Sequence, residues 1–131
     1  MATFLHTMLR SSDIERTRPF LEALGFVFSR DVPIVRDGHH EATNYFFNLP
    51  GDEAELEITV NEDGRTYDLG TAYGHVAIGV DDLAATLQSL AGQGIEPERA
   101  PYRIREGGNL LCFVREPVEG YRFELIEKGV G

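Results

Sequence analysis

An internal repeat constrains this chain more than any other feature of its sequence. His6 lies seven residues before Asp13, and His75 lies seven residues before Asp82. The same histidine-to-acid spacing therefore occurs twice, 69 residues apart. A repeat of this kind indicates two similar supersecondary units, so the fold is to be read as one unit used twice.

A second pair of residues follows nearly the same period. Glu57 in "AELEITV" and Glu124 in "GYRFELIE" are 67 residues apart, each close to the end of its half. Apolar and polar residues alternate in the segment around Glu57, which is typical of a strand with one buried face. Each half is therefore expected to carry a histidine on its first strand and a glutamate on its last.

Each half is predicted to contain one strand, one helix and three further strands. Strands are expected at 3–11, 26–35, 41–49 and 54–60 in the first half, and at 74–80, 95–104, 109–116 and 120–127 in the second. Helices are expected at 11–25, with Ser12 or Asp13 as the cap, and at 81–94, each ending in glycine. Pro19 removes a hydrogen bond from the first helix and predicts a kink or a delayed start.

The repeated order βαβββ predicts the α+β class. Two such modules, approximately 1–70 and 71–131, would form a half-open barrel with the helices outside. No linker or low-complexity segment divides the 131 residues, so a single domain is expected. The sequence leaves open whether the modules pair within one chain or across a dimer.

The charge of the chain excludes several partners. The formal net charge is -10, and the basic residues do not cluster, which argues against nucleic acid and anionic membrane surfaces. No apolar run approaches the roughly 20 residues of a transmembrane helix, and the N-terminus lacks a signal-peptide pattern, so we expect the cytoplasm. The one cysteine, Cys112, lies in the apolar run "NLLCFV" and is predicted to be a small buried hydrophobe.

Two histidines and two glutamates in related positions suit a divalent metal. A lone histidine on an apolar strand is ordinarily structural, and a glutamate on a half-exposed strand ordinarily faces solvent. If Glu57 or Glu124 points inward, however, an unpaired buried carboxylate costs on the order of several kcal/mol and needs a cation. Imidazole and carboxylate ligands with open positions favour nickel, cobalt, manganese or iron over a closed zinc site, although catalytic zinc can expand its coordination.

Four segments carry a resemblance to a known family. "FLHTMLRSSD", "ELEITVN", "YDLGTAYGHVAIGVDD" and "GYRFELIE" resemble glyoxalase I (lactoylglutathione lyase) of the vicinal oxygen chelate superfamily, from about Phe4 to Glu127. The resemblance implies a metal-dependent lyase. Such an enzyme isomerises the thiohemiacetal of methylglyoxal and glutathione to the S-D-lactoyl thioester, by proton transfer through an enediolate.

The resemblance also implies the metal ligands and the dimer. The ligands would be His6, Glu57, His75 and Glu124, with Glu124 first and Glu57 second as the catalytic carboxylate that moves the proton. The metal would be nickel or cobalt, with zinc possible. The family is similar in forming homodimers, so His6 and Glu57 would come from one chain and His75 and Glu124 from the other.

The resemblance defines the identity of the thiol cosubstrate less closely than it defines the metal ligands. Arg10 and Asn61 match the residues that hold the γ-glutamyl group of glutathione in the family. In "PYRIREGGN", Arg103 and Arg105 are candidates for the glycyl carboxylate, but Glu106 stands near where a basic residue is expected. Glutathione or another low-molecular-weight thiol therefore remains open. The turn "EPVEGY" before the last strand is one residue longer than the family's "DPDGY".

Two other functions were weighed against the lyase. A related metalloenzyme, such as an extradiol dioxygenase or a thiol transferase, would use the same fold, but dioxygenases of this kind use two histidines and one glutamate. Glu57 as a fourth ligand would occupy a position that oxygen or substrate needs. A metal-free drug-binding module is disfavoured because all four ligand positions are retained. His39 and His40, in the turn "RDGHHEAT", are not expected to bind metal.

Overall fold

The computed structural model describes residues 1–128 and divides into two compact units, the first Met1–Asp68 and the second from Leu69 onward. The first contains β1 (His6–Arg10), α1 (Ile14–Ala23), β2 (Val27–Arg36), β3 (His39–Asn48) and β4 (Glu55–Asn61). The second contains β5 (Val76–Val80), α2 (Leu83–Ala91), β6 (Leu111–Arg115) and β7 (Arg122–Glu127). The predicted α+β class is confirmed, and the first unit has the expected βαβββ order.

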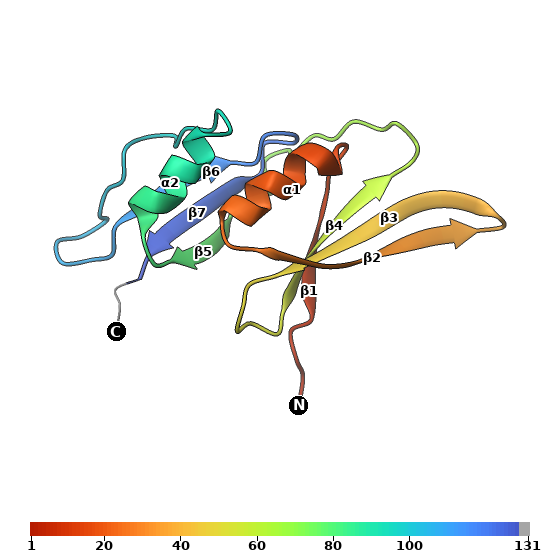
Figure 1. The fold of residues 1–131 in the computed structure, drawn as a ribbon, viewed down its shortest axis with the longest axis horizontal. Helices are drawn as coiled ribbons and strands as arrows, with labels where there is room; N and C mark the ends of the chain where they lie inside the picture. Colours follow the sequence, from red (N-terminus) through yellow and green to blue (C-terminus); the bar gives the residue numbers. More distant parts are fainter. Residues whose placement is uncertain (129–131) are drawn as a thin grey trace. The chain divides into compact units, whose positions relative to one another are not determined.

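The last strand of the first unit lies inside its sheet. The strand order is β1-β4-β3-β2, with β4 parallel to β1 and antiparallel to β3 (Figure 1). In this register His6 is level with Glu55, and Met8 is level with Glu57. Because side chains alternate along a strand, all four lie on one face of the sheet.

Helix α1 begins and ends where its sequence signals stand. The carboxylate of Asp13 accepts a hydrogen bond from the backbone N–H two residues on, at 3.0 Å, which caps the helix. Gly25 follows the helix with φ of +107°, a left-handed conformation that favours glycine. Pro19 lies within α1 without ending it. Phe20 and Leu21 are fully buried and are the main contribution of α1 to the core.

The two faces of the first sheet differ in character. Leu56 and Ile58 of β4 are buried, and their partners in the register, Phe47 of β3 and Leu9 of β1, are buried with them. Glu57 lies between Leu56 and Ile58 and therefore points to the opposite face. The alternating residues of β4 thus point to two different faces of the sheet, one an apolar core face and the other a face that carries polar groups.

The second unit repeats the arrangement with a three-stranded sheet of order β5-β7-β6 (Figure 1). Asp82 caps α2 by accepting from the N–H of Ala85 at 3.1 Å. Glu127 at the end of β7 accepts from the N–H of Leu83 at 2.9 Å, so strand and helix are joined at this point. Leu83 and Leu90 of α2 are fully buried.

The predicted strand at 95–104 is wrong. The structure has there a single bridge, between Tyr102 and Leu111, and one further backbone hydrogen bond from Glu98 to the carbonyl of Phe113 at 2.9 Å. Pro97 and Pro101 have no N–H to donate, so a continuous ladder cannot form along this segment. The second sheet consequently lacks the fourth strand of the first.

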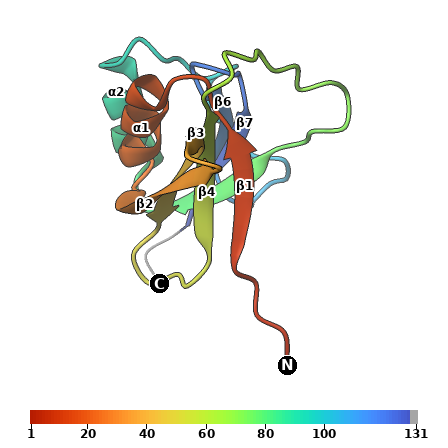
Figure 2. The ribbon, with the colours of Figure 1, turned by 90° about the vertical axis from the view of Figure 1, so that its right-hand side faces the viewer.

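Two segments of the described chain lie outside the regular elements. Residues before His6 extend away from the start of β1 (Figure 2), and residues 62–75 form turns and irregular structure between β4 and β5. No helix in residues 1–128 is long and apolar enough to cross a membrane.

Candidate metal centre

The first unit brings His6 and Glu57 together. His6 Nε2 lies 2.9 Å from Glu57 Oε2. The side chain of Glu57 is 9% exposed, whereas that of His6 is 44% exposed. Glu57 therefore does not face solvent, and its buried carboxylate requires a cationic or hydrogen-bonding partner.

The second unit brings His75 and Glu124 together in the same way. His75 Nε2 lies 3.3 Å from Glu124 Oε1, with the histidine 39% and the glutamate 13% exposed at their side chains. His75 was predicted to lie on the first strand of the second unit, but the structure places it directly before that strand, β5. Its backbone is fixed two residues earlier, where the hydroxyl of Tyr73 donates to the carbonyl of Arg122 at 3.0 Å. The pKa of Tyr73 is raised to about 12. Burial of the hydroxyl is the main cause, and the nearby Tyr121 is the second.

The spacing within each pair fits a shared metal ion. Metal bonds to imidazole nitrogen and carboxylate oxygen of roughly 2.0–2.2 Å place two ligand atoms about 2.8–3.1 Å apart at right angles, and about 3.3–3.6 Å apart at the tetrahedral angle. The observed separations, 2.9 Å and 3.3 Å, lie within these ranges. Nitrogen and oxygen donors are also a set that divalent transition metals accept.

Each unit brings two candidate ligands together. Among residues 1–128, no three histidine, cysteine, aspartate or glutamate side chains lie together so as to hold a metal ion. Two pairs lie close together, His6 with Glu57 in the first unit and His75 with Glu124 in the second. We call these pairs the first and second half-site.

Each half-site contains a phenylalanine that the sequence analysis missed. Phe46 of β3 is the cross-strand partner of Glu57, and Phe113 of β6 is the cross-strand partner of Glu124. The ring of each contacts the half-site histidine edge to face. The two phenylalanines are 67 residues apart, the same offset as the glutamates, and this period is the signal that would have found them.

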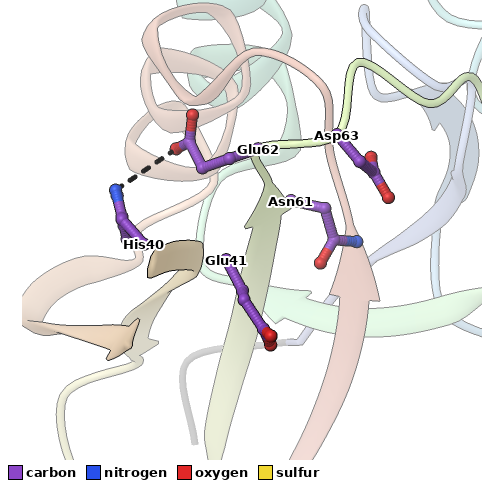
Figure 3. A pocket seen from close by; sticks show the side chains of 5 residues that line it. All are labelled: His40, Glu41, Asn61, Glu62 and Asp63. Carbon is purple, nitrogen blue, oxygen red and sulfur yellow. Dashed lines mark ion pairs between the residues drawn. The ribbon is translucent and has the colours of Figure 1, made fainter. Parts of the chain in front are cut away.

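Asn61, predicted to bind the thiol, lies at the end of β4. Its side-chain amide donates to the hydroxyl of Tyr67 at 3.0 Å. It lines a cavity of about 350 Å³ whose other lining residues are His40, Glu41, Glu62 and Asp63 (Figure 3). His40 and Glu62 point toward one another there, 4.0 Å apart. Three carboxylates make this cavity acidic.

The arginines predicted to bind the thiol have different surroundings. Arg105 lines a cavity of about 270 Å³ together with Glu124; its other lining residues are Ile104, Gly108, Asn109, Leu111 and Ile126. Arg103 instead donates from Nε to the carbonyl of Gly108 at 3.0 Å and so closes the loop. Arg10 lies at the end of β1, on the same face as His6. Arg105 is thus the arginine that shares a cavity with a half-site carboxylate.

The long turn before β7 is closed by a buried carboxylate. Glu116 is 2% exposed and accepts from the backbone N–H of Val118 at 2.9 Å, of Glu119 at 2.7 Å and of Gly120 at 3.3 Å. Beyond the turn, β6 and β7 pair in an unbroken register from Arg115 opposite Arg122 onward. The extra residue is therefore contained in the turn and leaves the strand that carries the second half-site in place.

Two α+β units, each with one histidine beside one glutamate, are typical of proteins built from a repeated module that carries part of a site. The sequence model of the Glyoxalase/Bleomycin resistance protein/Dioxygenase superfamily matches residues 3–125. The chain belongs to this superfamily.

Named relatives cover nearly all of this chain. The lactoylglutathione lyase of Haemophilus influenzae is 36% identical over 129 residues, which are 94% of this chain and 90% of that protein. A probable chloroplastic lactoylglutathione lyase of Arabidopsis thaliana is 33% identical over 130 residues, and this chain spans 35% of its length. The solved structure of the trypanothione-dependent glyoxalase I of Leishmania major matches with a TM-score of 0.77 at 30% identity, over 97% of this chain and 87% of that one.

Proposed function

We propose that this protein is a metal-dependent lactoylglutathione lyase. It converts the thiohemiacetal formed by methylglyoxal and a thiol into the S-lactoyl thioester. The observation that most strongly supports this proposal is the pair of half-sites. In each unit one imidazole nitrogen lies within 3.3 Å of one carboxylate oxygen. Relatives of this chain's own length that bear the name lactoylglutathione lyase support the same reaction.

The divalent metal would be held by His6, Glu57, His75 and Glu124. When bound, it supplies Lewis-acid polarisation of the two neighbouring oxygens of the substrate. Four nitrogen and oxygen ligands would leave a position open for substrate only in five- or six-coordinate geometry. This favours nickel or cobalt, with zinc as a further candidate.

The chain's own carboxylates move the proton. Glu124 takes the proton from C1 of the thiohemiacetal, and the bonding electron pair forms the C1–C2 double bond of an enediolate. The same carboxylate returns the proton to C2, and the hydroxyl proton at C1 passes to the oxygen at C2. This leaves the thioester at C1 and a hydroxyl at C2, with no change in overall composition. Glu124 is favoured over Glu57 because it lines a cavity, whose apolar members Ile104, Leu111 and Ile126 limit access of water.

The thiol is proposed to be glutathione or a similar low-molecular-weight thiol. Arg105 shares the cavity of Glu124 and is the best placed to receive its carboxylate. Arg10 and Asn61 remain the candidates for the γ-glutamyl end, and Arg103 contributes by holding the loop. Because the cytosolic glutathione pool is kept reduced, an enzyme using it is expected in the cytoplasm.

A homodimer is proposed to complete the site. His6 and Glu57 of one protomer would then join His75 and Glu124 of its partner. The first unit has an edge strand, β1, and exposed apolar side chains at and before it, Phe4, Leu5 and Met8. An apolar edge of this kind is typical of a surface that another chain covers.

Thioester formation tests the proposal directly. Metal-stripped protein is mixed with methylglyoxal, glutathione and nickel, and the thioester is followed by its ultraviolet absorbance. His75→Ala should lower kcat/KM by more than about 100-fold, beyond the 10–100-fold typical for partners of metal ligands. His39→Ala is the matched control, since His39 is exposed and lies outside both half-sites. No thioester with any divalent metal or common thiol would contradict the proposal.

A further inference from the structure

Neither half-site histidine is oriented by the hydrogen bond that usually fixes a metal-bound imidazole. Such a histidine ordinarily donates its second ring N–H to a carboxylate or a backbone carbonyl. Here Nε2 of His6 and of His75 faces its own glutamate. The hydrogen bonds within residues 1–128 include none from Nδ1 of either ring. Besides its glutamate, each ring has a further contact that bears on the direction of its nitrogens.

That contact is aromatic in both units. The rings of His6 and Phe46 are 6.2 Å apart at their centroids, with their planes at 86°. The rings of His75 and Phe113 are 5.3 Å apart at 79°. Edge-to-face pairs of this kind are attractive and directional, because the positive ring edge prefers the negative ring face. Each phenylalanine therefore favours one orientation of the histidine beside it.

Each phenylalanine is in turn held by an arginine. The guanidinium of Arg30 lies 4.0 Å from the centroid of the Phe46 ring and donates to Glu55 at 2.8 Å. The guanidinium of Arg122 lies 3.7 Å from the centroid of the Phe113 ring. These contacts restrain both rings by cation–π attraction.

The arginine of the second unit is itself fixed more firmly than that of the first. Arg122 makes hydrogen bonds of 2.9–3.1 Å to both oxygens of Glu98, a bidentate arrangement. The hydrogen bond from Arg122 lowers the pKa of Glu98, which favours the ionised carboxylate that this contact needs. The order Glu98, Arg122, Phe113, His75 is thus a continuous line of contacts that ends on the second half-site.

We propose that Phe113 and Phe46 are positioning residues that set the ring orientation of His75 and His6, with Arg122 and Arg30 holding them. This inference rests on the proposed function, because the orientation matters when the imidazoles bind metal. Phe113 has the larger effect, since its contact with histidine is shorter and its arginine has a bidentate partner.

The test measures nickel affinity, not turnover alone. Phe113→Leu keeps an apolar side chain and removes the ring, and it should raise the Kd for Ni²⁺ about tenfold in competition with a chromogenic chelator. Arg122→Met keeps the ring and removes its restraint, and it should raise the Kd about 2–5-fold. In the metal-free protein, the ring NMR signals of His75 should shift in both variants.

Phe28→Leu is the matched control. Phe28 also lies under an arginine, Arg18 at 4.4 Å, and contacts two aromatic rings of its own unit but no histidine. Its variant should leave the Kd for Ni²⁺ and the His75 signals unchanged. Equal loss in Phe28→Leu and Phe113→Leu, or an unchanged Kd in both Phe113→Leu and Arg122→Met, would overturn the inference.

If Phe113→Leu fails to fold, Arg122→Met decides the test, because it leaves the side chain of Phe113 in place.

Two results with the wild-type protein show how this inference stands relative to the proposed function. A wild-type protein that binds nickel but forms no thioester would contradict the lyase and leave the positioning role standing. A wild-type protein that binds no divalent metal would contradict both.

Discussion

The turn before β7 offers a prediction about stability that follows from one buried carboxylate. Glu116→Ala removes an acceptor that three backbone N–H groups share. Gly120 keeps a second acceptor, the carbonyl of Glu116 itself at 3.0 Å, so the main losses are the bonds from Val118 and Glu119. The perturbation therefore removes two short hydrogen bonds to a charged group.

The expected magnitude follows from those two bonds. Hydrogen bonds to charged groups contribute about 1.5–3 kcal/mol each, but water reaches part of the half-buried turn once the carboxylate is gone. We therefore expect Glu116→Ala to lower the free energy of unfolding by about 2–3 kcal/mol. Glu116→Gln keeps one acceptor oxygen and loses the charge, so about 1 kcal/mol is expected.

Urea denaturation followed by circular dichroism measures both variants. The matched control is Glu96→Ala, an exposed glutamate in the same unit, for which a change within about 0.5 kcal/mol is expected. The reasoning would be refuted if Glu116→Ala were as stable as Glu96→Ala. It would also fail if Glu116→Gln were the less stable of the two Glu116 variants.

Three further predictions use other measurements. In a symmetric dimer with shared sites, a 1:1 mixture of inactive His6→Ala and His75→Ala chains should regain about a quarter of wild-type activity after subunit exchange, and none if each site lies within one chain. Burial raises the pKa of the Cys112 thiol to about 11, so a thiol reagent should label it at neutral pH only after unfolding; labelling of the native protein would contradict this. Burial raises the pKa of Tyr73 to about 12, while an unfolded tyrosine ionises near 10. Wild type should therefore lose stability relative to Tyr73→Phe as the pH rises from about 10 to 12, and parallel pH profiles would refute it.

The sequence was sufficient to predict the parts of the fold that depend on local signals. Asp13, one of the two predicted caps, caps α1, and Asp82, at the start of the second predicted helix, caps α2. The alternation around Glu57 correctly assigned Leu56 and Ile58 to the buried face. Such features are readable because they depend on residues within a few positions of one another.

The half-site pairs were predictable from the repeat, and the contacts around them were not. His6 and Glu57 are 51 residues apart, and only the parallel register of β1 with β4 brings them together. That they bind metal stays a prediction. Arg122 could not be assigned to the second half-site, because it is an ordinary strand residue until cross-strand register sets its neighbours. Phe113 had one signal in the sequence, its 67-residue offset from Phe46.

The predicted strand at 95–104 shows where local reading failed. Its apolar and polar residues were compatible with a strand, but Pro97 and Pro101 remove two backbone donors from the ladder. The structure keeps the segment beside β6 with isolated hydrogen bonds. A prediction that gave these two prolines more weight than the alternation of apolar and polar residues would have left this segment out of the sheet.

The strand order has a consequence for when the two residues of each half-site meet during folding. In each unit the histidine lies at or directly before the first strand, and the glutamate lies on the last strand, which pairs with the first and sits between two neighbours. Parallel pairing across most of a unit closes a long loop and is a slow step. A partly folded unit therefore holds the histidine and the glutamate of its half-site apart. Metal that binds only the closed pair would stabilise the finished unit, so metal loading would report that folding is complete.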